Sequence, residues 1–240
     1  MPILLLARHA TNDFVKAGRL PGQHPNIHLN EDGRTQAESL GMALAGQSIA
    51  AVYSSQLERA METAWRVAVR HGLTVNIRPG LADINAGELT GMVVNDIGKD
   101  DRYKDAWKVI VEKPSEGRLP GGEALLEMQE RVVACLASIV KAHADAEEPK
   151  IQETTSVVPF VSSHQTDGKS DPTKPVEASP KQIVVVVMHA DPIKAALAHY
   201  LGMPFDNFQR LGAAPASYSA VVVDNDNQAR MIQHINRVPY

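Results

Sequence analysis

The apolar run ILLLA (residues 3–7), followed at once by Arg8-His9, decides the fold. A continuous apolar run of this length is typical of a strand buried on both faces of a parallel sheet. The run IVVVV (residues 183–187) repeats the pattern late in the chain and is followed by Met188-His189. We therefore expect two central parallel strands, each of which ends close to a histidine.

Helical periodicities separate the strands. The first helix is expected at 31–46, with Asn30 as N-cap, and the second runs from Ser55-x-x-Glu58, which has capping-box spacing, to Gly72. Further helices are expected over about 100–111, from Gly121-Gly122 to about His143, and from Asp191-Pro192 to Gly202. Short strands are expected at 51–53 and 75–77, and a final antiparallel pair at 218–223 and 230–235. This alternation predicts an α/β fold: a doubly wound, mostly parallel sheet with helices on both faces and one antiparallel edge strand.

One stretch interrupts the pattern. Residues 149–182 have no sustained period, and 15 of these 34 residues are Pro, Ser, Thr or Gly, so we interpret the stretch as an inserted surface loop rather than a domain. The 240 residues are then expected to form a single domain, residues 1–240, with this insert.

Composition limits the function classes. Twenty-four Lys and Arg against 28 Asp and Glu give a net charge of −4, which argues against nucleic acid and anionic membranes as partners. The single cysteine, Cys135, cannot form an intramolecular disulfide, which favours a reducing compartment, and we expect the cytoplasm. The apolar run at residues 3–7 is too short for a signal-peptide core, and no run approaches the length of a membrane span.

Residues that suit a phosphate follow three of the expected strands. Arg8-His9 follows the first, Ser54-Ser55 with Arg59 the second, and His189 the strand after the insert. Ligands of such sheets bind beyond the carboxyl ends of the strands. A cation in the first turn of a helix, as expected for Arg59, is disfavoured unless an anion binds there. The convergence therefore predicts an anion site.

Other chemistries lack their motifs. The sequence has no phosphate-binding P-loop, no dinucleotide fingerprint, no His-Glu-x-x-His and no Gly-x-Ser-x-Gly. A cysteine-based phosphatase would need an arginine six residues after the thiolate, where Cys135 has Lys141. His24 and His28 are separated by Pro25-Asn26, which argues against a shared helical metal face. We expect neither a metal nor another cofactor.

With these residues in view, the sequence resembles the histidine phosphatase superfamily, with its phosphoglycerate mutase-like fold. The resemblance covers nearly the whole chain except the insert. The segments that carry it are LARHAT (6–11), GRLPG (18–22), LNEDGRTQA (29–37), YSSQLERAMETA (53–64), LADINAGELTG (81–91), PGGE (120–123) and MHADPIK (188–194). Alanine follows both histidines, as Ala10 and Ala190, where glycine is common in the family.

The resemblance implies a catalytic site. His9 would be the nucleophile that forms a phosphohistidine, with its second ring nitrogen held by an acceptor such as a backbone carbonyl. Arg8, Arg59 and His189 would surround the phosphoryl oxygens without a metal. Asp83 falls where the family usually has glutamate and would be the general acid, with Glu88 as the alternative. The remaining candidate substrate-binding residues are Asn12 and Ala190.

Three functions remain open at this point. The first is a metal-independent phosphomonoesterase that acts on a small phosphorylated substrate, the second a phosphomutase of the phosphoglycerate mutase type, and the third a non-catalytic member that binds a phosphorylated ligand or a partner. The glycolytic mutases carry an asparagine where this chain has Val15, which argues against the second. Substrate specificity is expected from residues 12–28 and 96–118, while the natural substrate and the oligomeric state do not follow from the sequence.

Overall fold

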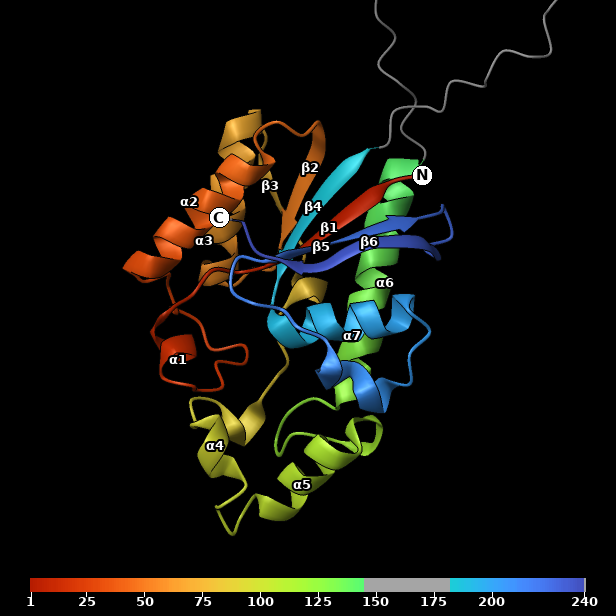
Figure 1. Cartoon of the computed structure of the whole chain (residues 1–240). Helices are drawn as coiled ribbons and strands as arrows, with labels where there is room; N and C mark the ends of the chain where they lie inside the picture. The colour runs from red at the N-terminus through yellow and green to blue at the C-terminus, as the bar shows by residue number, and fades with distance from the viewer. Residues whose placement is uncertain (145–181, 240) are drawn as a thin grey trace, which may run out of the picture.

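The computed structural model describes residues 1–144 and 182–239 (Figure 1). Within these residues six strands form one sheet in the order β3-β2-β4-β1-β5-β6. Neighbours among β3, β2, β4 and β1 pair in parallel, β5 is antiparallel to β1, and β6 is antiparallel to β5. The predicted fold class, a mostly parallel sheet with an antiparallel edge, is therefore confirmed. The strands are β1 (Ile3–Arg8), β2 (Ile49–Ser54), β3 (Val75–Ile77), β4 (Ile183–Met188), β5 (Tyr218–Val223) and β6 (Ala229–Arg237).

Helices cover both faces of the sheet, as predicted. Figure 1 shows α2 and α3 on one face and α6 and α7 on the other, with α4 and α5 beyond the carboxyl ends of the parallel strands. The helices are α1 (Asp13–Lys16), α2 (Glu31–Leu44), α3 (Glu58–Ala68), α4 (Val94–Ile97), α5 (Lys104–Glu112), α6 (Leu125–Ala144) and α7 (Ala190–Tyr200). Short 3₁₀ turns lie at Val69–His71, Pro79–Leu81, Gly87–Leu89, Pro114–Glu116 and Phe205–Arg210.

Both faces of the strand β1 are buried, which is why its sequence is a continuous apolar run. Successive side chains of a strand point to opposite faces. Leu4 and Leu6 pack in the core under α6 and α7, whereas Leu5 and Ala7 pack in the core under α2 and α3. Because both faces are covered, a polar residue at any of these positions would be buried without a partner, at a cost of a few kcal/mol.

The two helices that begin at the site start differently from the prediction. Ser55 does not cap α3: the N-cap is Leu57, with no side-chain hydrogen bond, and Glu58 accepts a hydrogen bond from the amide of Asn26. The N-cap of α7 is His189 rather than Asp191. Ser55 instead lies 2.9 Å from His189 Nε2, and Asp191 accepts hydrogen bonds from Lys194 and Gln209; local capping spacing does not register these contacts.

The predicted insert lies outside the described residues except for Gln182, and the single-domain organisation stays a prediction. Among the described helices, none combines the length and the apolar character needed to cross a membrane.

Candidate active site

The carboxyl ends of β1, β2 and β4 meet at one point of the sheet. These strands are neighbours in the order β2-β4-β1, with Ser54 paired to Val187 and Arg8 paired to Met188. The residues that follow the strands therefore come together, and the ring centroids of His9 and His189 are 5.1 Å apart. The convergence predicted from the sequence is present.

A cavity of about 250 Å³ opens at this point. Four of the candidate residues line it: Arg8, His9, Asp83 and Ala190. The remaining candidates, Asn12, Arg59 and His189, are fully buried. The other lining residues are Val15, Gly18, Arg19, Leu20, Pro21, Val94, Asn95 and Asp191.

The imidazole of His9 is held in one tautomer. Its Nδ1 lies 2.7 Å from the carbonyl oxygen of Ala10, and a carbonyl only accepts, so Nδ1 carries the proton. Burial lowers the pKa of His9 well below its ordinary value, and the charges of Arg8 and Arg59 lower it further. The ring is therefore neutral near pH 7, with the Nε2 lone pair free, which is the form required of a nitrogen nucleophile.

Two guanidinium groups make the site electropositive. Arg59 is fully buried, and its Nη2 donates to the carbonyl of Gly22 at 2.6 Å and to Asp83 Oδ2 at 3.2 Å. Arg8 donates through Nη1 to the carbonyl of Ala213 at 2.7 Å. Burial lowers the pKa of both side chains. The ordinary pKa of arginine is so high that both nevertheless remain charged.

Several buried nitrogen atoms in the site have no protein partner. Within the described residues, Arg8 Nε, Asn12 Nδ2, Arg59 Nε and His189 Nδ1 make no hydrogen bond. Buried polar atoms are normally paired, and each unpaired one requires an explanation. A tetrahedral oxyanion has enough acceptor oxygens to satisfy such a group of donors.

His189 is fixed through Ser55. Its Nε2 lies 2.9 Å from Ser55 Oγ, and its Nδ1 lies 3.6 Å from Asp83 Oδ2. Burial lowers the pKa of His189 well below its ordinary value, and Arg59 adds to the effect. The next residue, Ala190, begins α7, so the positive end of that helix dipole is at the cavity.

The geometry distinguishes the two candidate acids. Asp83 lines the cavity, and burial raises its pKa to about 6 despite the opposing charge of Arg59. Glu88 is not among the residues that line the cavity, and its Oε2 accepts from the Tyr103 hydroxyl at 3.1 Å. Of the two candidate acids, Asp83 is therefore the one positioned to exchange a proton with a ligand in the cavity.

Thr63 is a supporting residue that the sequence reasoning missed. Its hydroxyl oxygen accepts from the Ala10 amide at 3.0 Å and donates to the Arg59 carbonyl at 2.8 Å. It thus ties the chain after His9 to the helix that carries Arg59. Its position four residues after Arg59, on the same helical face, was the available signal.

The two regions expected to set specificity lie differently with respect to the cavity. Val15, Gly18, Arg19, Leu20 and Pro21 line it, whereas none of residues 96–118 does, and the source of specificity stays a prediction. Val94 and Asn95 reach the cavity instead. The Val94 amide donates to the Gly18 carbonyl at 2.9 Å, and Arg19 forms an antiparallel backbone bridge with Val93. This attachment brings only the start of α4 to the cavity. In the described ranges, no group of three or more His, Cys, Asp or Glu residues could hold a metal ion.

Comparison with known proteins agrees with this geometry. Residues 4–150 and 173–236 match the Histidine phosphatase superfamily (branch 1). The chain belongs to this superfamily. The predicted family is therefore confirmed, and so is the predicted class of enzyme, a phosphatase with the related phosphomutases.

Relatives within the histidine phosphatase superfamily include both activities. Phosphoserine phosphatase 1 of Hydrogenobacter thermophilus is 27% identical over 218 residues, which cover 91% of this chain and 85% of the relative. The probable phosphoglycerate mutase GpmB of Erwinia tasmaniensis is 30% identical over 128 residues, 53% of this chain and 58% of the relative. The solved complex of a mycobacterial glucosyl-3-phosphoglycerate phosphatase with VO3 has a TM-score of 0.77 at 22% identity, covers 99% of this chain and 100% of that chain, and shows the shared fold.

Proposed function

We propose that this protein is a metal-independent phosphomonoesterase that works through a phosphohistidine at His9. The observation that carries the proposal is the hydrogen bond from His9 Nδ1 to the Ala10 carbonyl, which leaves Nε2 unprotonated. Nε2 attacks phosphorus, the bond from phosphorus to the ester oxygen breaks, and that oxygen takes a proton from Asp83. A water molecule then attacks the phosphohistidine, gives its proton to the Asp83 carboxylate and releases phosphate and neutral His9.

The unpartnered donors supply the electrostatic part of the reaction. Arg8, Asn12, Arg59 and His189 bind the phosphoryl oxygens, and the amide of Ala190 at the start of α7 adds the helix dipole. We assign His189 a neutral ring: if the Ser55 hydroxyl, 2.9 Å from Nε2, is the donor of that contact, Nδ1 carries the proton and donates to the phosphoryl group. Charge on the transferring group is thus stabilised by fixed donors.

Asp83 is the proposed acid because its pKa suits the task. A positioned acid contributes about 10²–10⁴-fold to the rate, and the contribution is greatest when the pKa is close to the working pH. Burial brings the pKa of Asp83 to about 6. A substantial fraction is therefore protonated near neutral pH, ready to give its proton to the leaving oxygen.

We propose a small phosphomonoester with a carboxylate as substrate. The cavity is only about 250 Å³, and its lining includes the exposed cation Arg19 and the exposed amide Asn95. Two relatives are named for phosphoserine and phosphoglycerate, which both bear a carboxylate near the phosphate. The exposed mouth also favours hydrolysis over mutase chemistry, since a mutase must keep its phosphoenzyme from water.

Release of phosphate tests the proposal. We expect turnover of 4-nitrophenyl phosphate and phosphoserine in the presence of EDTA, its loss in His9→Ala, and its retention in His199→Ala, an exposed histidine of α7. Acid quenching with a ³²P-labelled substrate should trap a labelled enzyme that requires His9. A wild-type protein that never becomes labelled and releases no phosphate would instead support the non-catalytic binding member.

We also propose a cytoplasmic location, which the single cysteine supports.

A further inference from the structure

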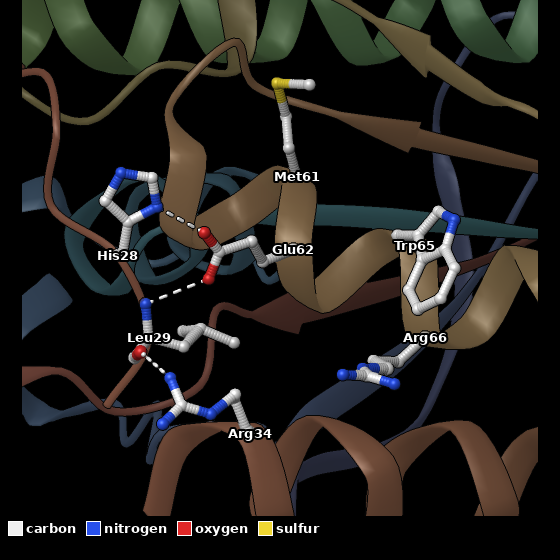
Figure 2. Close-up of a pocket in the computed structure, with 7 residues that line it drawn as sticks. All are labelled: His28, Leu29, Arg34, Met61, Glu62, Trp65 and Arg66. Atoms are coloured by element: carbon white, nitrogen blue, oxygen red, sulfur yellow. Dashed lines mark hydrogen bonds and ion pairs between the residues drawn. The ribbon is translucent and has the colours of Figure 1, made fainter. Parts of the chain in front are cut away.

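A second cavity, of about 560 Å³, lies between α2 and α3, and none of its lining residues lines the catalytic cavity (Figure 2). Its volume is in the range of sites for organic ligands, about 300–1,000 Å³. The lining residues are His28, Leu29, Arg34, Met61, Glu62, Trp65 and Arg66.

One part of the lining of this cavity is apolar. Trp65 is 51% exposed, and Met61 and Leu29 complete the apolar part of the lining. Aromatic side chains provide large contact areas for planar ligands, with stacking worth about 0.5–1.5 kcal/mol beyond burial. An exposed tryptophan in a concave site is therefore suited to a ligand with a flat body.

The acid in the cavity is already balanced. Glu62 uses one carboxylate oxygen for the Nδ1 of His28 and the other for the amide of Leu29, at 3.0 Å. The same carboxylate raises the pKa of His28, so the two groups form a local pair. Glu62 is thus not free to attract a cationic ligand.

The two arginines are only partly engaged. Arg34 donates through Nη1 to the Leu29 carbonyl at 2.9 Å (Figure 2). Arg66 stacks on Trp65 with its guanidinium carbon 4.9 Å from the ring centroid. Across the described residues, the guanidinium of Arg66 makes no hydrogen bond, and its ion pair with Glu38 is long, 3.8 Å, because Arg70 holds that carboxylate more closely. The lining therefore presents two positive charges that an anion could pair with.

We propose that this cavity binds an organic anion with a flat apolar body, of the aromatic carboxylate class. The body lies against Trp65 and Met61, and the carboxylate is held by Arg34 and Arg66. Planar guanidinium groups match the two oxygens of a carboxylate, and a cavity with apolar walls strengthens the pairing.

Nuclear magnetic resonance of the indole N–H groups tests this site directly, because the chain has two tryptophans, Trp65 in the cavity and Trp107 on α5 as an internal reference. We expect 2-naphthoate to shift the Trp65 signal saturably and to leave Trp107 in place, and neutral 2-naphthamide to bind at least tenfold more weakly. Arg34→Gln combined with Arg66→Gln should weaken 2-naphthoate at least tenfold, and Arg230→Gln, a surface arginine paired with Asp224, should not. If the double variant does not fold, Arg66→Gln alone carries the test.

Three results would overturn the proposal. The first is equal binding of 2-naphthamide and 2-naphthoate, or no shift of Trp65 at all. The second is displacement of 2-naphthoate by orthophosphate, which would assign the probe to the catalytic cavity. The third is a Trp65 signal that moves with protein concentration, together with sedimentation as a dimer. Because Met42 on α2 and Val69 just after α3 are also exposed, that result would assign this face to a second copy of the chain.

Discussion

Asp83 Oδ2 lies 3.2 Å from Arg59 Nη2, so the proposed acid and a proposed phosphate ligand share one buried contact. Arg59 lowers the pKa of Asp83, while burial raises it more strongly. A phosphate dianion on Arg59 would offset the guanidinium charge and repel the carboxylate. Both effects favour protonated Asp83, so arrival of the substrate itself would load the acid with its proton.

Asp83→Asn should separate good from poor leaving groups. An alkyl oxygen needs a proton as it leaves, whereas 4-nitrophenolate does not. We expect kcat/KM, which reports phosphoryl transfer to His9, to fall about 10²–10⁴-fold for phosphoserine and far less for 4-nitrophenyl phosphate. Glu88→Gln is the matched control and should retain most activity on both. Equal losses of kcat/KM on the two substrates, or a larger loss in Glu88→Gln, would remove Asp83 from the role of acid.

The pH profile should have an alkaline limb that belongs to Asp83. The acid is active only when protonated, and its pKa is about 6, so kcat/KM for phosphoserine should decline as the pH rises through this value. The substrate phosphate also titrates near pH 6. Comparison with Asp83→Asn isolates the enzyme group, because the variant should lack the part of the decline due to the acid. Superimposable profiles of wild type and variant would contradict this assignment.

The same carboxyl should reduce stability at neutral pH. Its pKa in the folded state, about 6, is above the ordinary value of 3.8, so the folded state binds more protons than the unfolded state between these values. The free energy of unfolding attributable to Asp83 therefore falls as the pH rises from about 4 to about 6. At pH 7.5, Asp83→Asn should raise the Tm by an amount that corresponds to about 1–3 kcal/mol in unfolding free energy. At pH 4 the substitution should change the Tm little. A variant less stable than wild type at pH 7.5 would mean that the pair with Arg59 outweighs the cost of burial.

The sheet and the meeting of the two histidines were predictable because each follows from one strong constraint. Burial on both faces requires apolar residues throughout β1 and β4, and parallel strands bring their carboxyl ends together, so His9 and His189 had to meet. The role of Ser55 was not predictable, since its spacing to Glu58 fits a capping box and its contact with His189 depends on tertiary packing. Asn95 was missed for the same reason: its neighbour Val94 is positioned by a hydrogen bond to Gly18, more than 70 residues away.

Gly33 should be essential for the loop that follows His9. It lies in α2, and a Cβ added there would be 1.9 Å from the carbonyl oxygen of Thr11. Gly33→Ala must push Thr11 and its neighbour Asn12 away, so we expect a loss of about 1–3 kcal/mol in unfolding free energy and reduced kcat. Gly46→Ala, where no atom lies within 4 Å, is the matched control for thermal denaturation and activity. Similar behaviour of both variants would show that the loop adapts without cost.

Arg19 should select substrates by their carboxylate. It is exposed at the mouth of the catalytic cavity, where Nη1 donates to the Gly91 carbonyl at 2.7 Å and fixes the side chain. We expect Arg19→Gln to raise KM about tenfold for phosphoserine and 3-phosphoglycerate, because a hydrogen-bonded charge pair is worth about 1.5–3 kcal/mol before solvent weakens it. The KM for 4-nitrophenyl phosphate, which has no carboxylate, should change little, and Arg19→Lys should recover part of the loss. A uniform rise in KM for all three substrates would mean that Arg19 attracts the phosphate itself. The carboxylate would then have to be recognised by another polar residue of the lining, such as Asn95.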